Sequence, residues 1–194
     1  MKRPAIFLDR DGVINYDFGY ANRTDEIRFI DGIFNLLKIV RKAGYVAIVI
    51  TNQAGIARGY YSEEDVKRTH EWMRARFREN GADVDAFYYC PFHPDATVPN
   101  YRADSPDRKP APGMILQAAA DWSIDLPRSL LVGDKESDLE AGRRAQVGML
   151  ILFDPAADAA MCPHDDGFKV GSLFELARNF ENIRRGSLAE RCKA

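Results

Sequence analysis

Two aspartates, Asp9 and Asp11, follow an apolar run of strand length and are separated by one residue. The run covers residues 5–8, and Gly12 directly after the pair can turn the chain. In open parallel sheets, ligands collect at the carboxyl ends of the strands. A carboxylate pair at such a point suits a metal ion and a phosphate. Taken alone, the tetrapeptide at residues 9–12 (Asp-Arg-Asp-Gly) is equally typical of an acidic turn, because turns favour Asp and Gly.

Further polar residues follow later apolar runs in the same way. The run at 45–50 leads into Thr51, and the run at 129–132 is followed by Asp134. Lys109 lies between them, directly before a proline. Taken singly, Thr51 is more often an ordinary strand residue and Lys109 an ordinary surface charge. Together they provide what phosphoryl transfer to a carboxylate requires: a nucleophile, a cation, donors for the phosphate oxygens and an acid for the leaving group.

The composition predicts one soluble domain. A chain of 194 residues can bury a substantial core but leaves little room for a second independent domain. Its 46% hydrophobic and 29% charged residues are typical of a soluble globular protein. The net charge of -2 gives no support for nucleic acid or an anionic membrane as the main partner.

The compartment is predicted from what the sequence lacks. No stretch approaches the length of a transmembrane segment or a signal peptide, so we expect a cytoplasmic protein. The three cysteines show no Cys-x-x-Cys spacing, which agrees with reduced thiols. We also expect a monomer.

Strand and helix patterns alternate along the chain. This alternation predicts an α/β fold, with a doubly wound, mostly parallel sheet flanked by helices and an active face at its C-terminal edge. We expect the domain to cover residues 1–180 and a C-terminal tail to follow at 181–194. The expected strands lie near 5–8, 45–50, 84–90, 129–132 and 149–153, and the expected helices near 33–42, 62–80, 113–122, 138–145 and 172–180.

Two segments interrupt the alternation. Residues 16–31 are rich in Tyr, Asp and Arg, and residues 91–111 are rich in proline. Long loops beside an active edge usually carry function. The alternative is that proline only stiffens a surface loop. We interpret both segments as specificity loops.

In their order along the chain, these residues resemble the four signature motifs of the haloacid dehalogenase-like (HAD) superfamily of phosphatases. Within it, the sequence resembles the D-glycero-D-manno-heptose-1,7-bisphosphate 7-phosphatase family over residues 4 to about 155, with histidinol-phosphate phosphatase as a near relative. The resemblance implies a HAD-like Rossmannoid fold without a large cap domain. The matching strings are FLDRDGVIN, Thr51-Asn52-Gln53 with Gly55-Ile56-Ala57-Arg58-Gly59, Tyr89-Cys90-Pro91, Arg108-Lys109-Pro110 and Gly133-Asp134-Lys135.

The resemblance implies a Mg²⁺-dependent phosphatase that acts through an aspartyl-phosphate. Asp9 would be the nucleophile and Asp11 the general acid and base, while Thr51 and Lys109 would bind the phosphoryl oxygens. Asp9, the backbone carbonyl of Asp11 and Asp134 would hold Mg²⁺, which prefers hard oxygen ligands. The metal would offset the repulsion between carboxylate and phosphate, on the order of 4 kcal/mol for unit charges about 4 Å apart at an effective dielectric of 20.

The substrate implied by the resemblance is a small phosphosugar, hydrolysed at the C7 phosphate of the heptose bisphosphate. Histidinol phosphate or another small phosphosugar is the alternative, and a non-catalytic phosphosugar-binding protein is less consistent with the full set of charged residues. A receiver-type signalling domain, a further alternative, would place its acidic pair before the phosphorylated aspartate, whereas here both carboxylates follow the first strand. Asp138 could orient Lys109 or a metal-bound water, or serve as a charge at a helix N-terminus. The implied substrate-binding residues are Asp17, Tyr20, Asn52, Gln53, Arg58, Arg108 and Lys135.

The sequence departs from the family at a structural zinc site in the second loop. Many members carry four zinc ligands there, in a Cys-x-His pair and a Cys-x-Cys pair before Arg-Lys-Pro. The four positions here hold Cys90, Phe92, Ser105 and Asp107, and His93 stands one place late. Because tetrahedral zinc needs four ligands, we expect structural zinc to be absent. The prolines of the loop would compensate by lowering the entropy of the unfolded chain.

Overall fold

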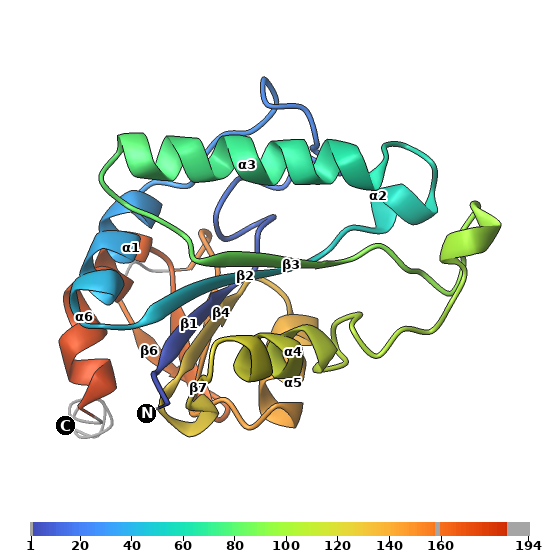
Figure 1. Ribbon diagram of the computed structural model, residues 1–194. Helices are drawn as coiled ribbons and strands as arrows, with labels where there is room; N and C mark the ends of the chain where they lie inside the picture. Colours follow the sequence, from blue (N-terminus) through green and yellow to red (C-terminus); the bar gives the residue numbers. More distant parts are fainter. Residues whose placement is uncertain (1, 158–159, 186–194) are drawn as a thin grey trace.

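A seven-stranded sheet forms the middle layer of the computed structural model, which describes residues 2–157 and 160–185 (Figure 1). The strand order is β3-β2-β1-β4-β5-β7-β6, and every pair is parallel except β6 with β7. The predicted doubly wound, mostly parallel sheet is therefore confirmed. The strands are β1 (Ala5–Leu8), β2 (Val46–Asn52), β3 (Ala86–Cys90), β4 (Leu130–Gly133), β5 (Met149–Phe153), β6 (Cys162–His164) and β7 (Gly167–Val170).

Helices cover both faces of the sheet. One face packs against α1, α3 and α6, and the other against α4 and α5 (Figure 1). Because both faces are covered, the central strands are apolar throughout, and all four residues of β1 are buried. The helices are α1 (Ile33–Lys42), α2 (Ala54–Ala57), α3 (Glu63–Glu79), α4 (Gly113–Asp121), α5 (Glu136–Arg144) and α6 (Leu173–Arg184), with short 3-10 helices at Pro99–Tyr101 and Leu126–Arg128.

The register of the central strands sets the position of the acidic pair. Leu8, the last residue of β1, pairs with Val49 of β2 on one side and with Val132 of β4 on the other. The next residue, Asp9, therefore emerges between the carboxyl ends of two neighbouring strands. Thr51, the second-last residue of β2, and Asp134, directly after β4, lie at the same edge.

Two features of the C-terminal part were not predicted. A hairpin of β6 and β7 joins the sheet beyond β5, with β7 parallel to β5. Helix α6 continues to Arg184, past the predicted domain end at residue 180. The remainder of the predicted tail, residues 186–194, lies outside the described residues.

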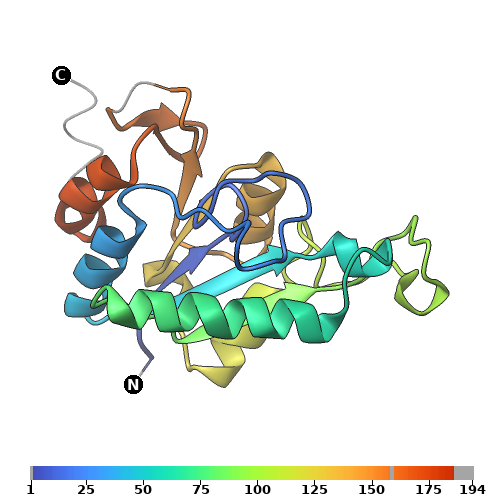
Figure 2. The same ribbon diagram turned by 90° about the horizontal axis from the view of Figure 1, so that it is seen from above.

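Both predicted specificity loops leave from the active edge of the sheet. The first returns to the core through backbone hydrogen bonds from Tyr16 to Arg28 and from Ile30 to Ile14. In Figure 2 the yellow-green segment that contains Pro99–Tyr101 extends away from the sheet beyond the end of β3. No large cap domain lies over this edge in the described residues, as the family resemblance implies. None of the helices in the described ranges is long and apolar enough to cross a membrane.

Candidate active site

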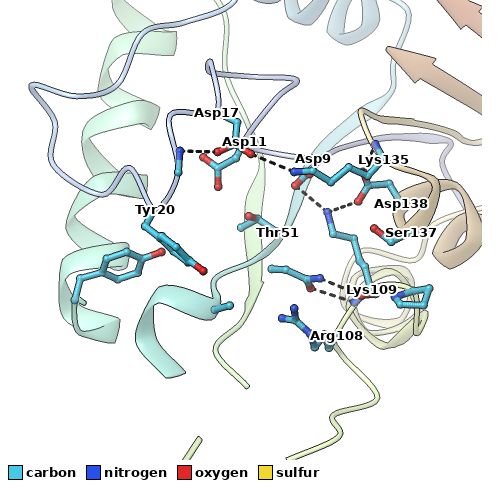
Figure 3. A pocket seen from close by; sticks show the side chains of 15 residues that line it. Asp9, Asp11, Asp17, Tyr20, Thr51, Arg108, Lys109, Lys135, Ser137 and Asp138 are labelled. Carbon is cyan, nitrogen blue, oxygen red and sulfur yellow. Dashed lines mark hydrogen bonds and ion pairs between the residues drawn. The ribbon is translucent and has the colours of Figure 1, made fainter. Parts of the chain in front are cut away.

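A cavity of about 630 Å³ opens at the carboxyl edge of the sheet (Figure 3). All four predicted catalytic residues line it. Among the predicted substrate-binding residues, Gln53 and Arg58 are not part of its lining. The residues from the sequence predictions that do line it are Asp9, Asp11, Thr51, Lys109, Asp17, Tyr20, Asn52, Arg108 and Lys135, and Asp138 joins them.

Lys109 lies between two buried aspartates at the floor of the cavity (Figure 3). Its Nζ is 2.8 Å from Asp9 Oδ1 and 2.7 Å from Asp138 Oδ1, and it donates to the Ile50 carbonyl at 3.0 Å. These three acceptors match the three N–H groups of an ammonium. Burial by itself would lower the pKa of Lys109, but the charges of Asp9 and Asp138 outweigh it and raise that pKa.

Asp138 performs both of the roles that the sequence left open. One of its oxygens contacts Lys109, and the other accepts the backbone N–H of Lys135 at 3.0 Å. Lys135 is the N-cap residue of α5, so Asp138 also stabilises the start of that helix. The position of the helix and the position of Lys109 are therefore linked through one carboxylate.

Asn52 holds the backbone of Lys109 in place. Its Nδ2 donates to the Lys109 carbonyl at 3.0 Å, and its Oδ1 accepts the Lys109 N–H at 3.1 Å. The side-chain amide thus pairs with the loop as a neighbouring strand would. Asn52 also lines the cavity, where the sequence predicted it.

Three carboxylates converge where Asp9 and Asp138 line the cavity, with Asp134 behind its lining. Oxygens of Asp9, Asp134 and Asp138 all lie within 4.8 Å of one another. Burial raises the pKa of Asp9 to about 8, with the charge of Lys109 opposing this rise and that of Asp138 adding to it. Burial also raises the pKa of Asp134. A cation bound among these groups would offset the cost of keeping them ionised.

The surroundings of Asp134 fit a hard metal ion. Its Oδ1 is buried without a hydrogen-bond partner in the described part of the chain. Gly12, with a φ of +96°, leaves the space beside it open, since a Cβ there would lie 2.2 Å from Asp134 Oδ2. An unpartnered buried carboxylate oxygen is a suitable ligand for Mg²⁺.

The Asp11 carboxylate accepts four hydrogen bonds. Arg10 Nε at 3.0 Å and Asn15 Nδ2 at 2.9 Å donate to Oδ1, while an Arg10 terminal nitrogen at 2.8 Å and Gln53 Nε2 at 3.0 Å donate to Oδ2. Burial would raise the pKa of Asp11. The charge of Arg10 and these hydrogen bonds outweigh burial and lower that pKa. Asp11 is therefore held as a carboxylate, able to accept a proton.

Gln53 lies behind the cavity wall and connects two predicted catalytic residues. Its Nε2 donates to Asp11 and, at 2.8 Å, to Thr51 Oγ1, while its Oε1 accepts the Tyr61 hydroxyl at 2.8 Å. Because Thr51 accepts this bond, its own hydroxyl hydrogen can be donated to an oxygen in the cavity. The sequence predicted Gln53 as a substrate contact, and the structure instead shows its amide occupied by protein groups.

The rim of the cavity carries exposed charges. Lys135 Nζ is 3.2 Å from Asp17 Oδ2 and 3.5 Å from Asp134 Oδ2, and its side chain is 55% exposed. Arg108 donates to the Phe92 carbonyl at 3.2 Å. Arg58 lies outside the cavity lining, with its guanidinium 5.8 Å from the centre of the Tyr20 ring.

The loop in which the family resemblance implies a zinc site is connected by other contacts here. Cys90 is buried, and its Sγ is 3.9 Å from the Phe92 carbonyl. Ser105 Oγ accepts the backbone N–H of Asp107 at 3.2 Å. Two clusters of side chains in the described residues could hold a metal ion, Asp9 with Asp134 and Asp138, and Glu136 with His164 and Asp165, and neither includes a residue of this loop. The absence of structural zinc stays a prediction.

Sequence relatives decide the family. The chain is 53% identical over 153 residues to the D-glycero-alpha-D-manno-heptose-1,7-bisphosphate 7-phosphatase of Burkholderia mallei, a match that covers 79% of this chain and 81% of the relative. The chain belongs to the heptose-1,7-bisphosphate 7-phosphatase family. The prediction of a phosphoric monoester hydrolase is thereby confirmed. The beta-anomer enzyme of Photorhabdus laumondii is 45% identical over 149 residues, covering 77% of this chain and 79% of that protein.

A family model and solved structures agree with this assignment. A model described as HAD-hydrolase-like matches residues 107–152. The D,D-heptose 1,7-bisphosphate phosphatase of B. bronchiseptica, solved with magnesium and phosphate, has a TM-score of 0.77 and 28% identity over 93% of this chain and 99% of that one. A HAD-like protein of Mesorhizobium loti has a TM-score of 0.84 and 33% identity over 95% of this chain and 87% of that one.

Proposed function

We propose that the protein hydrolyses the C7 phosphate of D-glycero-D-manno-heptose 1,7-bisphosphate, with Mg²⁺, through an aspartyl-phosphate on Asp9. The names of its relatives support the substrate. The observation that supports the mechanism is the position of Asp9, which lines an open cavity, contacts the Lys109 ammonium and lies close to the Asp134 and Asp138 carboxylates. The proposed nucleophile therefore has a cation and candidate metal ligands beside it.

The metal would be held by residues that the structure brings together. Asp9, the backbone carbonyl of Asp11 and Asp134 are the proposed protein ligands. When bound, Mg²⁺ would supply positive charge that reduces the repulsion between the Asp9 carboxylate and the phosphate.

The first chemical step is transfer of the phosphoryl group to Asp9. A carboxylate oxygen of Asp9 forms a bond to phosphorus, and the bond between phosphorus and the sugar O7 breaks. For this step Asp11 carries a proton, although its contacts in the free protein lower its pKa, and it gives that proton to O7, so that the sugar leaves as an alcohol. Thr51 donates its hydroxyl to a phosphoryl oxygen, and Lys109 stabilises the charge on the same group.

The second step restores the enzyme. Asp11, now a carboxylate, takes a proton from a water molecule that attacks the phosphorus of the aspartyl-phosphate. The acyl-phosphate bond breaks, inorganic phosphate is released, and Asp9 is free again. The four donors around Asp11 stabilise the ionised form that this step needs.

Recognition of the substrate is assigned to the rim. Arg108 and Lys135 would bind the second phosphate or the sugar hydroxyls, and Asp17 and Tyr20 would lie beside the sugar. Binding energy from these remote contacts can lower the barrier of the chemical step. The second phosphate therefore gives the enzyme a means of selecting a bisphosphate over a monophosphate.

The test is the position and order of phosphate release. Purified protein with Mg²⁺ is given both anomers of the heptose 1,7-bisphosphate, since relatives named for each anomer match the chain. Phosphorus NMR is expected to show loss of the C7 phosphate while the anomeric phosphate remains. Loss of the anomeric phosphate first, comparable rates on histidinol phosphate, or no turnover would contradict the proposal.

A further inference from the structure

Arg10 lies between the two aspartates in sequence but is not part of the cavity lining. Its side chain is fully buried. Its Nε and one terminal nitrogen donate to the two oxygens of Asp11, at 3.0 and 2.8 Å, so the guanidinium meets the carboxylate with two parallel hydrogen bonds. This bidentate geometry restrains the direction of the carboxylate as well as its charge.

Arg10 supplies half of the donors around Asp11 and the one positive charge among those four donors. The other two donors are the side-chain amides of Asn15 and Gln53, one on each oxygen. Each amide makes a single bond to Asp11, and a single bond leaves the carboxylate free to turn about it. The planar Arg10 fork removes that freedom, because it engages both oxygens at once.

The remaining contacts of Arg10 come from two distant segments. A terminal nitrogen donates to the Ala21 carbonyl in loop 16–31 at 3.0 Å. The other lies 3.4 Å from His70 Nε2 on α3, and the His70 ring stacks on Phe87 with centroids 4.5 Å apart. A guanidinium can only donate, so Nε2 accepts and the proton of the neutral ring is on Nδ1.

We propose that Arg10 is a positioning residue that holds the Asp11 carboxylate toward the leaving-group oxygen and links it to loop 16–31 through the Ala21 carbonyl. The inference rests on the proposed role of Asp11 as general acid. It assigns to a buried side chain, remote from the substrate, control over the geometry of proton transfer. His70 holds the opposite end of the guanidinium.

The consequence can be measured with two leaving groups. A sugar alkoxide is a poor leaving group and needs the acid, whereas p-nitrophenolate leaves readily without it. The ratio kcat/KM reports events up to the first irreversible step, which is transfer of the phosphoryl group to Asp9. Loss of Asp11 positioning should therefore reduce kcat/KM on the sugar phosphate far more than on p-nitrophenyl phosphate.

The experiment compares Arg10→Met and Arg10→Lys with wild type on the heptose bisphosphate and on p-nitrophenyl phosphate. General acid catalysis contributes about 100-fold or more, so we expect Arg10→Met to lose about 100-fold on the sugar phosphate and less than about tenfold on the aryl phosphate. Arg10→Lys keeps a cation without the fork and should show a selective loss of intermediate size. The matched control is Arg41→Lys, because Arg41 also pairs with an aspartate, Asp85, at 2.9 Å but lies on α1, away from the cavity.

A second pair of variants keeps the test independent of the folding of the Arg10 variants. His70→Gln retains an acceptor for Arg10 and should keep the wild-type ratio, whereas His70→Leu removes it and should show the selective loss. Equal losses on both substrates, or no loss in any Arg10 or His70 variant, would overturn the inference. If wild type hydrolyses other primary sugar phosphates but not the heptose bisphosphate, the proposed substrate fails. The Arg10 comparison then proceeds on glucose 6-phosphate, or on whichever primary sugar phosphate wild type hydrolyses, with p-nitrophenyl phosphate.

Discussion

The floor of the cavity is more deeply buried and has more internal contacts than its rim. The floor comprises Asp9, Lys109 and Asp138, which are buried, and Asp11, whose side chain is 19% exposed. The rim comprises Asp17, Tyr20 and Lys135, which are exposed, and Arg108, which is half-buried. Each region contains a lysine paired with aspartate. The Lys109 side chain is 3% exposed and makes three short contacts, while Lys135 is 55% exposed and contacts Asp17 at 3.2 Å.

In the proposed mechanism, the floor carries out the chemistry and the rim selects the substrate. Charges in a buried, low-dielectric site interact strongly and need no rearrangement during the reaction. Exposed charges are screened by water and salt, so they can exchange a protein partner for a substrate phosphate at low cost. Substitutions on the floor should therefore affect turnover, and substitutions at the rim should affect substrate preference.

The largest effect should come from Asp9→Asn. The substitution keeps the volume of the side chain but removes the nucleophile, so phosphate release should fall below detection while the fold is retained. Phosphate release is measured with saturating Mg²⁺, and circular dichroism serves as the control for folding. Activity near that of wild type would show that Asp9 is not the nucleophile, and the proposal that floor residues carry out the chemistry would fail.

Removing Lys109 should damage both stability and turnover. Lys109→Met leaves two buried carboxylates facing each other without a cation, a change that costs about 3–5 kcal/mol when a buried pair is broken. Turnover should fall about 100- to 1,000-fold, as it does when an electrostatic stabiliser of a transition state is lost. Urea unfolding and kcat are the measurements.

The double variant Lys109→Met with Asp138→Asn separates the two effects. It removes one of the two facing carboxylates, so it should regain much of the stability without regaining activity. If stability does not return, the loss of stability in Lys109→Met comes from lost packing of the lysine side chain. The unpaired buried carboxylates are then not its cause.

His70, which contacts Arg10 behind the floor, should make the free energy of unfolding depend on pH. Burial and the charge of Arg10 lower the pKa of His70 from 6.5 to about 3. Between pH 6.5 and about 3, His70 binds a proton in the unfolded chain but stays neutral in the folded chain. The contribution of His70 to the free energy of unfolding therefore falls as the pH falls toward 3. At pH 5 the loss is about 2 kcal/mol relative to neutral pH.

The measurement is the free energy of unfolding between pH 5 and 7, in wild type and in His70→Gln. Other titrating groups contribute equally to both proteins, so the difference between the two curves isolates His70. The curve for wild type should fall more steeply with decreasing pH by the stated amount. Parallel curves would show that the histidine takes up a proton in the folded protein over the same range.

At the rim, Arg108→Ala should change preference more than rate. We expect about a tenfold loss of kcat/KM on the heptose bisphosphate and little change on a sugar monophosphate, because the lost cation served the second phosphate. The loss should shrink as salt is added, since the half-buried guanidinium still faces the open cavity, where salt screens its attraction for a phosphate. An equal loss on both substrates would place Arg108 with the floor residues.

The smallest effect expected is that of zinc removal. The positions at which the family resemblance implies zinc ligands are occupied by Cys90, Phe92, Ser105 and Asp107, so chelation should remove activity only through Mg²⁺. Added Mg²⁺ should restore full activity without refolding, and metal analysis of protein purified without added metal should find no tightly held zinc. One tightly held zinc per chain would contradict the prediction that residues 90–107 hold no structural zinc.

The sequence predicted the floor better than its connections. Asp9 of the floor follows an apolar strand directly, as Asp134 does beside it, and Thr51 lies at the end of another; parallel strands bring such positions to one edge. The partners of Asn52 and Gln53 could not be predicted, because an amide beyond a strand end may face substrate or protein, and only tertiary packing decides between them. The β6–β7 hairpin was missed since its strands of three and four residues are too short to show a clear alternation.

The two bonds between Asn52 and the Lys109 backbone have a consequence for how such enzymes diversify. Because these bonds attach the lysine backbone to the end of β2, they restrain its position independently of the contacts that the loop between β3 and residue 108 makes. That stretch can then change in length, lose a metal or acquire prolines without displacing the cation next to Asp9. Grafting the corresponding loop of a relative between Cys90 and Arg108 is accordingly a route to new substrates that leaves the catalytic residues unchanged.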